Sequence, residues 1–299
     1  QTCALPIFPI PLMYLFEDKN GKKQVVDGRQ RISAILDFLE GKFKLNNLRI
    51  LKQFNGCCFA DLDLKQQGVI EDFQLLFYII QPPTPERVKY DIFDRVNRGG
   101  TPLNKQEMRN ALYRGRCTRM LDKLCCSPEF LIATGRSINK ERMKDQYVVL
   151  RAMAFLMLHR GEFKDIPALQ YRGDIDDFLA RFMVYVNDNA PEKLIVDYEN
   201  LFIRCMQISY DLLGENGFRF SGNGIRRPIN MPLFEALSYL FSFVPEKIDY
   251  TWVSRLILDI ESVKEEFDDS RYFSGNIDST TSVSFRFDRM DKIINRIQL

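Results

Sequence analysis

The stretch that decides the fold runs from Val25 to Ile35 and reads VVDGRQRISAI. The β-branched pair Val25-Val26 predicts the end of a short strand, and Asp27-Gly28 predicts a tight turn. A helix is expected directly after the turn, because four apolar residues lie at i, i+3, i+4 and i+7. These residues are Ile32, Ile35, Leu36 and Leu39. A strand that passes at once into a helix predicts an α/β arrangement for this part of the chain.

The turn carries residue types that suit an anion. Asp27 is placed to cap the helix N-terminus, and Gln30 could complete a capping box. Gly28 allows a ligand or neighbouring segment to approach the backbone closely. Arg29 and Arg31 oppose the helix dipole, which makes more sense if a phosphate lies between them and the free N–H groups. The alternative is a capped helix whose arginines pair with nearby carboxylates.

Outward from this segment, strand and helix signals mix before Pro85, and the pattern after it is nearly all helical. Phe8–Phe16 predicts a strand, residues 48–60 resemble irregular strands, and Gln74–Ile80 resembles a buried strand. Helices are expected near residues 86–96, 105–113, 116–125, 140–159, 174–187, 191–213, 230–243, 250–267 and 285–297. The expected class is therefore α+β.

A second informative segment, Phe93–Ala111, reads FDRVNRGGTPLNKQEMRNA. Its Gly99-Gly100 pair predicts a turn between two helices, and Asn104 with Glu107 predicts a capping box for the second helix. Four polar residues converge on this corner: Arg95, Asn97, Arg98 and Arg109. They indicate a surface for phosphate or nucleic acid, or simply a helical corner with polar caps.

Together the two segments resemble the GmrSD-type restriction endonuclease N-terminal family, also known as domain of unknown function 262. That family carries a V-x-DGQQR-L-T-like motif and, further on, F-x-R-x-N-x-GGT-x-L-x-x-x-E-x-R-x-A. Here they stand as VVDGRQRISAI and FDRVNRGGTPLNKQEMRNA, with Arg29 in place of the family's first Gln. The resemblance extends over nearly all of residues 8–299.

The resemblance implies a ParB/sulfiredoxin-like core with a small mixed sheet, which places a strand–turn–helix motif against nucleotide phosphates. It implies a nucleotide site, with an NTP as ligand and Mg²⁺ as a candidate cofactor. The implied nucleotide-binding residues are Asp27, Gly28, Arg29, Gln30, Arg31, Arg95 and Asn97. Among these, Asp27, Gln30 and Arg31 are the candidate catalytic residues, and no resident metal site is expected.

The resemblance also suggests how the chain is divided. An α/β domain is expected over residues 8–112 and an all-α domain over 113–299. Residues 1–7 match one translated frame of a common sequencing adapter, so we interpret them as a non-native tail. The family's upstream I-P-x-F-Q-R-type segment is not present, so we expect the ParB-like domain to be truncated at its N-terminus.

Composition excludes several classes of protein. Lys plus Arg is 42 and Asp plus Glu is 40, which argues against a bulk-charge nucleic-acid binder. The single histidine, His159, cannot supply the HNH nuclease domain found in family relatives, and we expect it to be a partly cationic residue at a helix C-terminus. Seven cysteines without a CxxC suit a reducing cytoplasm, and no apolar run could span a membrane.

Three functions remain open from the sequence. The favoured one is an NTP-binding or NTP-hydrolysing module of a prokaryotic restriction or anti-phage system that controls a separate nuclease subunit or domain. The second is a non-catalytic DNA-binding or adaptor module. Its contact residues would be Arg98, Arg109, Arg114, Arg116 and Arg119. The third is a ParB-like nuclease that depends on Asp27.

Overall fold

The computed structural model describes residues 10–17, 21–81, 84, 88, 92, 103–220, 226–245, 250–270 and 272–297. The chain divides into two compact units, residues 1–102 and residues 103–299. This division comes before the first helix of the second unit, whereas the sequence placed the boundary after residue 112. The helix expected at 86–96, apart from residues 88 and 92, and the first part of the Phe93–Ala111 segment lie outside the described residues.

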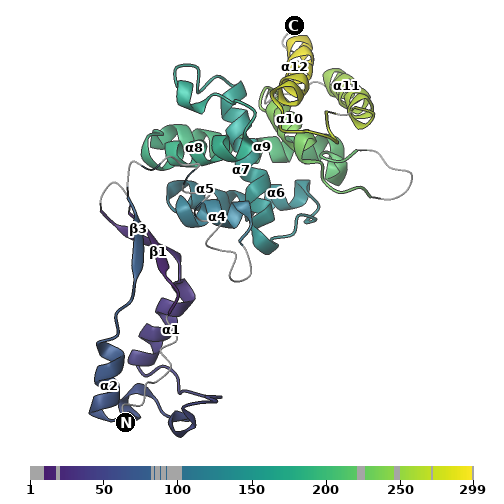
Figure 1. Cartoon of the computed structure of the whole chain (residues 1–299). Coiled ribbons are helices and arrows are strands. Elements are labelled where there is room, and N and C mark those ends of the chain that lie inside the picture. The colour runs from purple at the N-terminus through teal and green to yellow at the C-terminus, as the bar shows by residue number, and fades with distance from the viewer. Residues whose placement is uncertain are drawn as a thin grey trace. The chain divides into compact units, whose positions relative to one another are not determined.

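The N-terminal unit contains a three-stranded mixed sheet in the order β2-β1-β3 (Figure 1). The central strand β1 (Met13–Glu17) is antiparallel to β2 (Lys23–Asp27) and parallel to β3 (Phe77–Ile80). Helix α1 (Arg29–Leu39) begins two residues after β2 ends. The α+β class and the strand–turn–helix unit are therefore confirmed.

The region 48–60 differs from the expectation of irregular strands. It forms two short 3₁₀ helices, η1 (Lys52–Phe54) and η2 (Phe59–Asp61), followed by helix α2 (Leu64–Glu71). The side chain of Asn55 accepts from the Leu48 N–H at 2.8 Å and donates to the Leu48 carbonyl at 3.3 Å. Because these backbone groups are satisfied locally, no partner strand is needed.

Strand β3 is also less buried than its apolar sequence predicts. Of its four residues, Ile80 is buried, while Phe77, Tyr78 and Ile79 are each more than a third exposed. An uninterrupted apolar run cannot by itself distinguish a buried strand from one with an open face.

The second unit is all helical in its described residues (Figure 1). Its helices are α4 (Lys105–Leu112), α5 (Arg116–Cys125), α6 (Pro128–Ala133), α7 (Lys144–His159), α8 (Ile175–Asp188), α9 (Glu192–Leu213), α10 (Met231–Phe241), α11 (Tyr250–Asp268) and α12 (Thr280–Ile297). Helix α7 is the centre of the core, since every residue from 148 to 157 is buried. The helices expected after residue 103 are confirmed within a few residues, and the short α6 was not expected.

A buried ion cluster joins three of these helices. Glu235 of α10 accepts from Arg286 Nη2 of α12 at 2.6 Å and from Arg151 Nε of α7. Arg151 also donates through Nη2 to Asp278 at 2.6 Å. Glu235, Arg151 and Arg286 are almost fully buried, so each charge depends on its partners to offset the loss of water.

His159 lies at the C-terminal end of α7, as expected, but it is not the partly cationic residue that we expected. Its ring stacks on Phe287, with centroids 3.6 Å apart and planes at 10°. Burial, together with the nearby charge of Arg286, lowers the pKa of His159 to about 3. The imidazole is therefore neutral at physiological pH. No helix in the described ranges is both long enough and apolar enough to cross a bilayer.

The depressed pKa of His159 predicts a pH-dependent loss of stability. Below pH 6.5 the unfolded imidazole binds a proton that the folded one excludes, so acidification down to about pH 3 favours unfolding. Between pH 6.5 and 5 this single group should cost about 2 kcal/mol of unfolding free energy. The single tryptophan, Trp252 in α11, allows urea unfolding of this unit to be followed by fluorescence.

The matched variant is His159→Phe, which retains an aromatic ring and removes the titration. We expect its unfolding free energy to fall less than that of the wild type over the same pH interval, by about that same 2 kcal/mol. Parallel pH profiles for the two proteins would show that His159 is protonated normally in the folded state.

Candidate functional site

The turn between β2 and α1 depends on Gly28. This residue is in the left-handed region at φ 94° and ψ 6°, and it is the N-cap of α1. A Cβ atom here would lie 2.5 Å from the Cγ of Met13, whose side chain is fully buried. Both the backbone conformation and the space therefore require glycine.

The predicted capping by Asp27 and Gln30 is wrong. Because Gly28 is the N-cap, no side chain caps the helix. The Asp27 carboxylate instead accepts from Arg31 Nη2 across one helical turn, and Arg31 Nη1 donates to the Pro11 carbonyl at 2.6 Å. Arg31 thus fixes the turn to the segment before β1. For Arg31, the alternative that the arginines pair with nearby carboxylates is therefore correct.

The first turn of α1 consequently keeps free hydrogen-bond donors. The first helical bond runs from the Ile32 N–H to the Gly28 carbonyl at 2.8 Å. The N–H groups of Arg29, Gln30 and Arg31 precede it and have no acceptor among the described residues. Both Arg29 and Gln30 are exposed. Three backbone donors therefore lie at the same helix end as the exposed side chains of Arg29 and Gln30, and free donors at a helix N-terminus are suited to bind an anion.

Residues 5–114 match the family described as GmrSD restriction endonuclease, N-terminal domain. This part of the chain belongs to that family. The match includes both the Val25–Ile35 and the Phe93–Ala111 segments, and it takes in residues 5–7, which the sequence assigned to a non-native tail. Neither the curated proteins nor the solved structures contain a match to the chain.

Membership of the GmrSD N-terminal family indicates a protein of a restriction or defence system. It confirms the family identification that the two motifs carried. The further likeness to ParB and sulfiredoxin stays a prediction, since no solved structure matches. Among the described residues there is no group of three or more His, Cys, Asp or Glu side chains placed to hold a metal.

The other predicted site residues separate into three groups. Arg95, Asn97 and Arg98 lie outside the described residues. Arg114 and Arg119 are exposed, as a contact with DNA would need. The side chains of the remaining two, Arg109 and Arg116, bond to other parts of the helical unit.

Arg109 is fully buried, where no duplex could reach it. Its Nη1 donates to Asp176 at 2.8 Å and its Nε donates to Gln106 at 2.9 Å. Burial alone would raise the pKa of the Asp176 carboxyl, but hydrogen bonds from Lys105 and Arg109 hold that pKa below its usual value. The prediction that Arg109 lies on an exposed basic face is therefore wrong. Its burial depends on the ion pair with Asp176, a residue of another helix that the local sequence pattern does not reveal.

Arg116 is half-buried and closes the end of α8. Its guanidinium donates to the carbonyls of Val186 and Ala190, and Nη1 pairs with Glu192 at 3.0 Å. Cations are favourable at a helix C-terminus, which explains the position. Arg109, Arg114, Arg116 and Arg119 therefore do not form one solvated basic surface.

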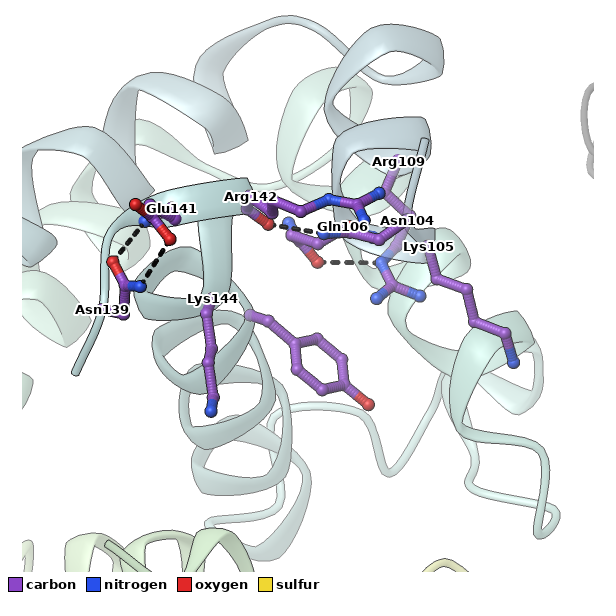
Figure 2. Close-up of a pocket in the computed structure, with 9 residues that line it drawn as sticks. Asn104, Lys105, Gln106, Arg109, Asn139, Glu141, Arg142 and Lys144 are labelled. Carbon is purple, nitrogen blue, oxygen red and sulfur yellow. Dashed lines mark hydrogen bonds between the residues drawn. The ribbon is translucent and has the colours of Figure 1, made fainter. Parts of the chain in front are cut away.

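The sequence did not predict a pocket that lies within the helical unit (Figure 2). It has a volume of about 510 Å³ and is formed by α4, the 3₁₀ helix η4 (Glu141–Met143) and the first turn of α7. The capping box that begins α4 is confirmed: Asn104 accepts from the Glu107 N–H at 2.9 Å, and Glu107 accepts from the Asn104 N–H at 2.7 Å. The cluster of Lys and Arg around residues 140–144 was the available signal.

Substitution of Gly28 should destabilise the N-terminal unit, and comparison with a second glycine separates the cost of the left-handed backbone from the cost of contact with Met13. Gly28→Ala meets both the left-handed backbone and the Met13 side chain, so we expect about 2–4 kcal/mol of local destabilisation. Gly41→Ala is the matched control, because Gly41 also has a positive φ but has open space around its Cβ. It should cost only about 1–2 kcal/mol.

The measurement is hydrogen exchange of the β1 and β2 amides in the full chain, which reports on this unit by itself. Exchange should accelerate far more in Gly28→Ala than in Gly41→Ala. Equal acceleration in the two variants would mean that contact with Met13 does not constrain the turn.

Proposed function

We propose that the N-terminal unit binds a nucleoside triphosphate and acts as a regulatory module of a prokaryotic restriction or anti-phage system. The observation that carries this proposal is the uncapped first turn of α1, which presents free N–H groups beside Arg29 and Arg31. Membership of the GmrSD N-terminal family supports the setting in a restriction system.

The phosphate chain would accept hydrogen bonds from the first-turn N–H groups, where the helix dipole also favours negative charge. Arg29 is exposed and can turn toward the phosphates without breaking any contact of the fold. Arg31 is held by Pro11 and Asp27, so its positive charge is already positioned beside the turn.

Hydrolysis would require two more groups from the same turn. Gln30 is exposed and carries an amide that could orient a water molecule. Asp27 gives one carboxylate oxygen to Arg31 and keeps the other, so it is the residue that would hold a Mg²⁺ ion, which would supply positive charge to offset the phosphates. Binding or hydrolysis would then control a nuclease located in another domain or subunit that acts on DNA.

Calorimetric titration of the full chain with each of the four common NTPs tests this site. Arg29→Ala should weaken binding about tenfold, since a charge-assisted hydrogen bond contributes about 1.5–3 kcal/mol. Because Arg29 is exposed, this variant should fold normally. Arg31→Ala should weaken binding more, because it also frees the Asp27 carboxylate beside the phosphates.

Arg49→Ala is the matched control, since Arg49 is an exposed arginine of the same unit away from the turn. It should bind as the wild type does. Absence of NTP binding by the wild type, or equal binding by all variants, would contradict the proposal. Retained DNA binding without any NTP effect would then favour an adaptor or DNA-binding module.

A further inference from the structure

We infer that the pocket between α4, η4 and α7 is a second anion site, which binds the phosphate groups of a small phosphorylated molecule. It lies wholly within the helical unit and shares no residue with the turn at Asp27–Arg31. The inference therefore does not rest on the proposed function.

The deepest cation of the pocket is Arg109, and it has an unused donor. Its Nε and Nη1 are bonded to Gln106 and Asp176, while Nη2 has no acceptor among the described residues. The guanidinium lies over the ring of Tyr147, 5.1 Å from the centroid. Figure 2 shows that this guanidinium, held by Gln106 on one side, is directed into the pocket. A fully buried cation with a free N–H that faces a cavity is suited to a charged acceptor.

Three further cations come from separate elements and face the same space: Lys105 of α4, Arg142 of η4 and Lys144 of α7. Lys144 makes no ion pair with any described residue, and it begins a helix that has no side-chain cap. Lys105 pairs with Asp176 and Arg142 pairs with Glu107, in both cases through a cation that is more than half exposed. Because both cations are themselves more than half exposed, an incoming phosphate can approach them beside their carboxylate partners.

The backbone at Arg142, one of these cations, is strained. Arg142 and Met143 are consecutive non-glycine residues, each at φ 57°. Residues in this region cost about 1–3 kcal/mol each and are concentrated at functional sites. Here the strained turn is held by Asn104, whose Nδ2 donates to the Arg142 carbonyl at 2.7 Å, and by the ion pair between Arg142 and Glu107.

The geometry favours a small ligand over the backbone of a nucleic acid. A volume of about 510 Å³ lies in the usual range for small-molecule sites. The fully buried Arg109 can be reached by a terminal phosphate that enters the pocket, whereas a phosphodiester on a duplex stays at the surface. The carboxylate of Glu141, bonded to Asn139 at 2.9 Å, would also repel an extended polyanion. Three of the four cations already pair with Asp176 or Glu107, and Lys144 has no ion pair among the described residues. The pocket therefore suits a phosphate group that contacts Lys144 and the unused donor of Arg109.

The test uses the full chain with inorganic pyrophosphate as the probe, titrated by calorimetry in an Arg31→Ala background that weakens the first proposed site. Lys144→Ala should weaken pyrophosphate binding about tenfold or more, the loss expected for one charge-assisted contact. Lys140→Ala is the matched control, because Lys140 is exposed and nearby but does not line the pocket. It should change the affinity less than twofold.

Hydrogen exchange in the wild type locates the site independently. Pyrophosphate should slow exchange in residues 139–147, and this protection should persist in Arg31→Ala and diminish in Lys144→Ala. The inference is overturned if Lys144→Ala binds as Lys140→Ala does, or if protection falls outside this segment. It is equally overturned if a short DNA duplex, but not pyrophosphate, protects residues 139–147.

Discussion

The helical unit depends on the fully buried carboxylate of Glu235, held between Arg151 and Arg286. Removing one of the two arginines would leave the buried carboxylates short of positive charge, which typically costs about 3–5 kcal/mol. The same cluster reaches the pocket, because Arg151 Nη1 donates to the Tyr147 hydroxyl at 3.1 Å and Tyr147 lies under Arg109. The deepest wall of the anion site is therefore positioned by the ion cluster that joins α7, α10 and α12.

Much of the architecture could be predicted from the sequence because it depends on local patterning. The apolar spacing of Ile32 to Leu39 predicted α1, and similar spacing predicted the helices from residue 105 onward. The capping box of Asn104 and Glu107 was also predictable, since both partners lie within one turn. The family could be identified because its motifs are contiguous stretches of residues.

The errors arose where a distant residue decides the outcome. Asp27 was expected to cap α1, but the close approach of Met13 places Gly28 at the cap and leaves Asp27 to Arg31. Arg109 was expected on a surface, and Asp176 draws it into the interior. Similarly, the pocket needs α4 and the strained turn before α7 to meet, and no spacing rule within either segment predicts that contact.

The parallel pairing of β1 with β3 has a consequence for the order in which the N-terminal unit forms. Strands β1 and β2 are joined by a short connection, whereas β3 joins β1 only after the whole of α1, η1, η2 and α2 has been traversed. Closing the longer loop costs more entropy, so the hairpin and the turn at Gly28 can form early and the third strand adds later. As the chain leaves the ribosome, the proposed phosphate-binding turn would thus be assembled well before its sheet is complete.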